Sequence, residues 1–205
     1  IVVMSTATTI LIAQYLGARN KLKLGETCTV SLAFSFVFSS LAALGFILFN
    51  KTIFSWLGVP PETMDETVLY TTIVGAGLPI QALYYTFVAV FRGHSLTRVT
   101  MYIALVMNLL HIGSNYLLIF GAGPIPSLGV LGVSISTWLS KLIGLGLIVW
   151  LFRKLLDLDV GWKYLHPFPW ETLKGLLRIS IPSGGETLSY QLSQTTIMKM
   201  VNLLG

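Results

Sequence analysis

Long apolar runs separated by short polar stretches dominate the chain. Five of the six runs are long enough to cross the hydrocarbon core of a bilayer, which takes roughly 20 residues of helix. The two-residue alternation of half-buried strands is missing, and an open sheet edge cannot lie in lipid. The sequence therefore predicts an all-α, polytopic transmembrane helix bundle. Its apolar runs cover approximately residues 1–16, 28–49, 68–91, 100–120, 130–152 and 179–203.

The longest polar interruption lies between Leu155 and Ile179. Pro167 and Pro169 break the chain there, and a run of apolar residues follows from Trp170. The apolar positions of this run share one side of a helix, with basic residues flanking them, which predicts a short amphipathic helix at the inner leaflet. An ordinary connecting loop is the alternative. The apolar positions are Leu173, Leu176, Leu177 and Ile179, and the flanking ones are Lys174 and Arg178.

Composition agrees with a membrane location. Of the 205 residues, 54% are hydrophobic and 10% are charged, whereas soluble domains carry about 25% charged residues. The single cysteine, Cys28, excludes an internal disulfide framework. A net charge of +5 would suit nucleic acid, but the basic residues lie between apolar runs. We therefore expect the lipid bilayer, and no nucleic acid, as a partner.

The basic residues also predict an orientation. Ten of the 13 lie in alternate loops, and the opposite loops contain Lys51 alone. The positive-inside rule places the basic loops in the cytoplasm, so we expect a multi-pass protein of the cell membrane. The ten are Arg19, Lys21, Lys23, Arg92, Arg98, Arg153, Lys154, Lys163, Lys174 and Arg178.

Five motifs, in order, resemble segments of the multidrug and toxic compound extrusion (MATE) transporters. They resemble the end of the second helix, the fourth helix with its exit, the fifth helix, the entry to the sixth and the start of the seventh. The chain departs from the family pattern at His94–Thr100. The motifs are Ile12–Asn20, Gly77-Leu78-Pro79 with Phe91-Arg92-Gly93, Asn108 with Asn115–Gly121, Pro126–Val133 and Ile181–Tyr190.

This resemblance implies a fragment of a twelve-helix transporter with two lobes, running from within helix two to helix seven. Residues 1–152 would belong to the first lobe, 153–178 to the cytoplasmic loop, and 179–205 to the first helix of the second lobe. Such transporters alternate between inward-open and outward-open states. The resemblance implies a monomer that exports drugs or other organic cations in exchange for Na⁺ or H⁺, with no further cofactor. The alternative is a lipid-linked oligosaccharide flippase, which would need several cationic residues in the cavity.

Two groups of polar residues are candidates for ion coupling. Glu186 lies within the last apolar run, where a carboxylate is costly and by default marks an ion or substrate pathway; an acid paired near the inner interface is the alternative. Asn108, His111 and Asn115 are spaced by three and four residues and share one helix face. Amides and a neutral imidazole suit Na⁺ binding or proton relay, although interhelical hydrogen bonding explains them equally well. Thr137 resembles a residue that adjoins this site in the family.

Other polar residues are candidates for a substrate cavity. Aromatic faces attract organic cations and uncharged amides tolerate varied compounds. Lys141 must face the bundle interior, where a structural contact is favoured over a role in transport. Pro79 and Pro182 predict helix kinks. The candidates for the cavity wall are Gln81, Tyr84, Tyr85, Tyr190, Gln191 and Gln194.

A membrane-embedded enzyme is not expected. Such an enzyme needs paired acids, a cluster of metal-binding histidines or an activated nucleophile. None of these patterns occurs in the sequence, so no metal other than Na⁺ is expected.

Overall fold

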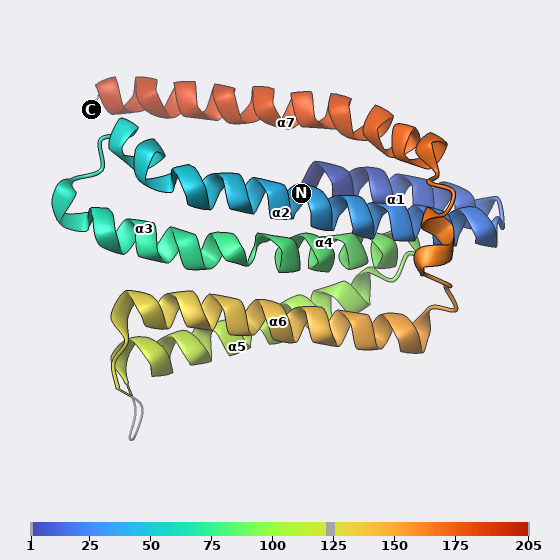
Figure 1. Ribbon diagram of the computed structural model, residues 1–205, viewed down its shortest axis with the longest axis horizontal. Helices are drawn as coiled ribbons and strands as arrows, with labels where there is room; N and C mark the ends of the chain where they lie inside the picture. The colour runs from blue at the N-terminus through green and yellow to red at the C-terminus, as the bar shows by residue number, and fades with distance from the viewer. Residues whose placement is uncertain (1, 122–125, 205) are drawn as a thin grey trace.

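The computed structural model describes residues 2–121 and 126–204, with side chains described up to residue 197 (Figure 1). Within these residues the chain is helical and contains no strand, which confirms the all-α prediction. The helices are α1 (Val2–Gly17), α2 (Lys21–Trp56), α3 (Pro61–Ala76), α4 (Leu78–Gly93), α5 (Thr97–Phe120), α6 (Gly129–Leu155), the 3₁₀ turn η1 (Trp162–Leu165) and α7 (Trp170–Leu204).

Four spans have the length and apolarity to cross a membrane. They are α2, α5, α6 and the bent pair of α3 and α4 taken together. The apolar helix α1 has only 16 residues. The predicted span at 179–203 is long enough as part of α7, but it does not join these four, because Glu186 and several glutamines and threonines make it more polar.

The helices lie side by side and the connections gather at the two ends of the bundle. The α1–α2, α4–α5 and α6–α7 connections lie at one end, and the α2–α3 and α5–α6 connections lie at the other (Figure 1). The basic residues singled out above lie in the three connections at the first end or in the helix turns next to them. Their shared position is what alternating spans require, and their cytoplasmic location stays a prediction.

A sharp bend separates α3 from α4 beside Pro79, within the apolar run 68–91, where the sequence predicts a kink. The two helices meet at 43°. Pro79 lacks the N–H that a continuous helix would need, and its ring would clash with the preceding turn. The N–H of Gly77 bonds to Val74 O at 3.0 Å, which tightens the last turn of α3. This leaves Ile73 O without its helical partner, and Trp138 Nε1 of α6 donates to it at 2.6 Å.

Small residues let α5 and α6 approach closely. A Cβ added at Gly132 would collide with the backbone of Leu118, and one at Gly144 would collide with the Met107 side chain. Small residues at such positions are typical of helix pairs in membranes, where close packing replaces the hydrophobic effect. The pair forms one wall of the bundle.

The predicted amphipathic helix is not a separate element. One continuous helix, α7, begins at Trp170 and passes through Pro182 without a break. The apolar side of its first turns is buried rather than exposed to lipid, because Leu173 and Leu176 pack with Met4 and Leu11 of α1. The predicted amphipathic stretch is therefore the first part of α7, and its position at the inner leaflet stays a prediction. The predicted boundary at residue 178 falls inside α7, and the division into lobes stays a prediction.

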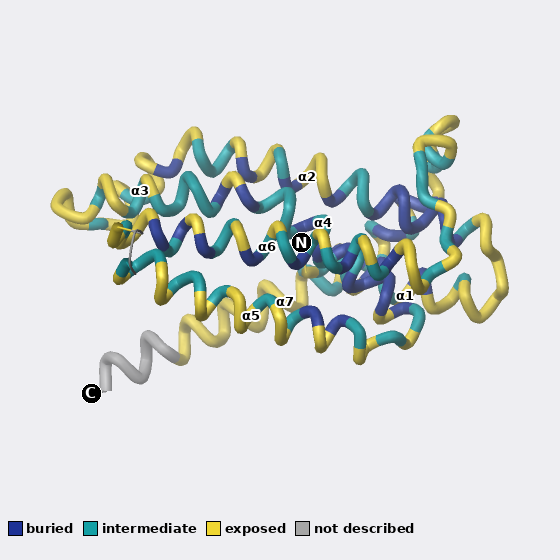
Figure 2. The backbone as a smooth tube through the Cα atoms, turned by 90° about the horizontal axis from the view of Figure 1, so that it is seen from below, coloured by how far each residue is buried: buried dark blue, intermediate teal, exposed yellow. Residues whose placement is uncertain are grey.

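Burial is uneven along the molecule. Buried positions gather where α1, α2 and α4 meet, around Ile12, Cys28, Val90 and Phe91 (Figure 2). By contrast, α7 is exposed from Gly185 to Ile197. The part of the chain with a packed core thus lies at the end with the basic connections.

Candidate functional site

The predicted polar face of α5 meets α6 at the His111 ring. Asn115 Nδ2 and Thr137 Oγ1 each lie 3.3 Å from His111 Nε2. The hydroxyl of Thr137 also donates to Val133 O at 2.8 Å. Two of the predicted coupling residues therefore contact the same imidazole nitrogen.

These contacts place two incompatible demands on His111 Nε2. An amide N–H from Asn115 requires that Nε2 carry a lone pair, whereas Thr137, whose proton is given to Val133, requires an N–H there. One protonation state of Nε2 satisfies one neighbour only. Asn115 Oδ1 is buried and has no hydrogen-bond partner among the described residues. Rotating the amide would turn that oxygen toward a protonated Nε2. Asn115 can therefore donate to Nε2 when Nε2 has a lone pair and accept from it when Nε2 carries a proton.

Two serines hold the backbone beside this ring. The hydroxyls of Ser114 and Ser136 lie 2.6 Å apart, and Ser136 Oγ donates to His111 O at 3.2 Å. These bonds join α5 to α6 at the same level as His111. They fix the position of the histidine backbone while the hydrogen bonds of its ring remain free to change.

A cavity of about 180 Å³ lies beside His111 and joins α4, α5 and α6. It brings together residues that the sequence assigned separately to ion coupling and to substrate binding. The rings of Tyr84 and Tyr85 on its wall lie 5.7 Å apart in an edge-to-face arrangement. The lining residues are Gln81, Tyr84, Tyr85, Met107, Asn108, His111, Thr137, Ser140 and Lys141.

Comparison with known proteins identifies the family. The family model described as MatE matches residues 1–117. The chain belongs to the MatE family. The "Uncharacterized transporter YisQ" of Bacillus subtilis is 35% identical over 203 residues, covering 98% of this chain and 44% of the relative. The "Probable multidrug resistance protein NorM" of Thermotoga maritima is 28% identical, covering 100% and 43%.

Solved structures agree on the fold of this MatE chain. "Crystal structure of MATE in the bent conformation" superposes with a TM-score of 0.85 at 23% identity, covering 95% of this chain and 43% of that one. This confirms the predicted resemblance and the helical membrane bundle. Members of the MatE family are transporters rather than enzymes, as expected. The chain spans less than half the length of the relatives it matches.

The candidates on α7 do not join the cavity of the MatE chain. Within the described residues, α7 contacts α1 and α2 but none of α4, α5 and α6. Glu186, Gln191 and Gln194 are exposed, and the described side chains offer Glu186 no ion pair. Tyr190 OH accepts a hydrogen bond from Gln194 Nε2 at 3.0 Å. The predicted site is thus assembled on α4–α6 only.

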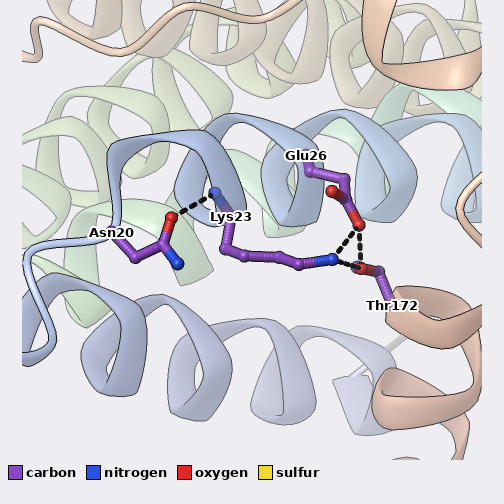
Figure 3. Close-up of polar contacts among 4 residues, drawn as sticks. All are labelled: Asn20, Lys23, Glu26 and Thr172. Carbon is purple, nitrogen blue, oxygen red and sulfur yellow. Dashed lines mark hydrogen bonds and ion pairs between the residues drawn. The ribbon is translucent and has the colours of Figure 1, made fainter.

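A buried carboxylate escaped the sequence analysis. Glu26, on the second turn of α2, is 8% exposed, and its Oε1 lies 2.8 Å from Lys23 Nζ. Thr172, in the first turn of α7, donates to the same oxygen (Figure 3). Asn20 caps α2 by accepting from the Lys23 N–H at 3.1 Å. The only sequence signal was an acid three residues after a lysine, which on most helices marks a solvated face.

Proposed function

We propose that the full-length protein is a secondary active antiporter of the plasma membrane that exports drugs or other organic cations in exchange for Na⁺ or H⁺. It acts as a monomer with its basic loops in the cytoplasm. MatE membership and the names of the relatives support multidrug export. The polar cavity among apolar helices supports a pathway for small compounds.

The hydrogen bonds of His111 carry the coupling part of the proposal. A coupling group must bind and release its ion during each cycle, and its surroundings must accommodate both states. With Nε2 unprotonated, Asn115 donates to it. With Nε2 protonated, Thr137 accepts from it, as does the unpartnered Asn115 Oδ1 after rotation of the amide. In the cation that H⁺ binding produces, both ring nitrogens carry N–H, so Nε2 needs the arrangement with an acceptor. His111 therefore suits H⁺, and Asn108, which lines the same cavity, adds a second amide.

Na⁺ is the other candidate ion. Amide and hydroxyl oxygens are hard ligands of the kind that such cations prefer, and no described residue forms a hydrogen bond with the buried Asn115 Oδ1. Sodium would compete with the protonated imidazole for the same oxygens. Coupling to H⁺ requires His111 to become positively charged, whereas Na⁺ binding requires it to stay neutral. An experiment with separate ion gradients distinguishes the two.

The cavity wall supports organic compounds as cargo. Tyr84 and Tyr85 offer aromatic surface, which stacks on rings and attracts cations, and Gln81 adds an adaptable amide. The flippase alternative would need several cationic residues in the cavity. Among the described residues that line this cavity, Lys141 is the only lysine or arginine.

The test is export of a fluorescent cationic dye from proteoliposomes that contain the full-length protein. H⁺ and Na⁺ gradients are imposed separately. We expect His111→Gln to abolish efflux driven by the coupling ion, and His166→Gln, at an exposed loop position, to leave it unchanged. Glu186→Gln run alongside tests the α7 carboxylate. Unchanged gradient-driven efflux in His111→Gln would move the coupling role to Glu186, and no efflux under either gradient would overturn the antiporter proposal.

A further inference from the structure

Lys141 brings a positive charge to the cavity, and no described residue offers it an anionic partner. It lies in the middle of α6, is half-buried and lines the cavity beside Gln81, Tyr84 and Asn108. Among the described residues it makes neither an ion pair nor a side-chain hydrogen bond. This differs from the structural contact that the sequence favoured for it.

The surrounding helices contain no carboxylate that could pair with it. In the described chain α6 contacts α3, α4 and α5, and neither α4, α5 nor α6 contains an aspartate or glutamate. The acids of α3 are confined to Glu62, Asp65 and Glu66 in its first two turns. Trp138 of α6 bonds to Ile73, which lies near the other end of α3 from these acids. Lys141 lines the cavity together with residues of α4, not of α3.

A charged lysine at this depth is costly unless it has an anion or water beside it. The cavity gives it room, and the neutral amides and phenols on the wall do not compensate its charge. An ammonium group is a compact donor that binds carboxylates strongly when both are withdrawn from water. The tyrosine rings lie next to it on the same wall, where they would contact an apolar or aromatic body.

We propose that Lys141 is a specificity-determining residue that binds a carboxylate on the exported compound. The inference rests on the proposed function and shifts its preferred cargo from simple cations to compounds that carry a carboxylate. Compounds that combine an aromatic body with a carboxylate bind here in preference to simple cations. A cationic group elsewhere on the same molecule remains compatible, because the faces of Tyr84 and Tyr85 attract it.

Binding of three matched fluorescent probes to the purified full-length protein tests this inference. Dansylglycine carries the carboxylate, its methyl ester is neutral, and dansylcadaverine is a cation. We expect the wild type to bind dansylglycine at least about tenfold more tightly than the ester, as a charged hydrogen bond predicts. Lys141→Met should remove this preference and Lys141→Arg should retain it. Lys51→Met, at an exposed position on α2, is the matched control and should behave as the wild type.

The outcomes separate this inference from the antiport proposal. Equal affinity of the wild type for dansylglycine and its ester would overturn the inference without any variant, as would a preference that survives Lys141→Met. If dansylcadaverine is exported under an ion gradient, the antiport proposal is supported whether or not dansylglycine is preferred. A carboxylate preference that depends on Lys141, in a protein that shows no gradient-driven efflux, would uphold the binding site and overturn the antiport.

Discussion

Trp138 of α6 donates its indole N–H to the carbonyl of Ile73 at 2.6 Å, at the point where α3 ends. This bond replaces the one that Gly77 would give in a continuous helix. A Cβ at Gly77 would lie 3.3 Å from the same indole nitrogen, so the ring sits against the bend itself. The bend turns α4 so that Gln81 and Tyr84 face the cavity that Lys141 and His111 line.

Trp138→Phe should therefore destabilise the bundle. The substitution leaves Ile73 O without a donor in an apolar region, which costs about 1–3 kcal/mol. Thermal unfolding of the full-length protein in detergent measures the change. Trp162→Phe is the control, because Trp162 is 78% exposed, and it should leave the unfolding temperature unchanged. Equal unfolding temperatures for Trp138→Phe and the wild type would contradict the prediction and show that the indole bond to Ile73 O does not stabilise the bend.

The close approach of α5 and α6 can be tested as a pair. A methyl group at Gly144 would strike Met107, and overpacking of this kind costs about 1–3 kcal/mol. We expect Gly144→Ala to lower thermal stability and the double variant Gly144→Ala/Met107→Ala to recover part of the loss, which a double-mutant cycle measures. Gly146→Ala, where a Cβ meets nothing within 4 Å, should be neutral or slightly stabilising. Additive effects of the two substitutions would contradict the contact.

The sequence predicted the part of the site that lies on one helix. Spacings of three and four residues place Asn108, His111 and Asn115 on one face whatever surrounds them. The contact between His111 and Thr137 depends on the register of α5 against α6, which close packing sets, so only the family resemblance could indicate it. Pro79 predicted a kink but not that Trp138 would bond to the freed carbonyl.

The sequence predicted less of what depends on long-range packing. Glu26 lies at the edge of an apolar run and resembles a solvated acid, because its burial requires α7, which begins more than 140 residues later. The first turns of α7 have the pattern of an interfacial helix, and an apolar stripe cannot reveal whether lipid or α1 covers it. Glu186 and Gln191 stay candidates from the sequence, since α7 contacts neither α5 nor α6 in the described chain.

Thr137→Val should impair ion coupling while leaving the fold intact. Valine preserves the shape of threonine but removes the acceptor that a protonated His111 Nε2 needs. We expect efflux under an H⁺ gradient to fall severalfold. Ser183→Ala, on α7, is the control, since among the described residues the Ser183 hydroxyl bonds only to Ile179 O of its own helix. If Thr137→Val instead abolishes efflux driven by Na⁺ and spares efflux driven by H⁺, the hydroxyl serves as a sodium ligand.

The contact of Glu26 with Thr172 should hold the first turns of α7 on the bundle. Glu26→Gln removes the ion pair with Lys23 and weakens the bond from Thr172, and charged hydrogen bonds of this kind contribute about 1.5–3 kcal/mol. We expect faster amide hydrogen exchange at the start of α7, measured by mass spectrometry on peptides covering residues 170–180. Lys21→Gln is the control: its pair with Asp157 is fully exposed and exposed pairs contribute little. Exchange that accelerates equally in both variants would show that charge near this end, rather than the Glu26 contact, holds α7 in place.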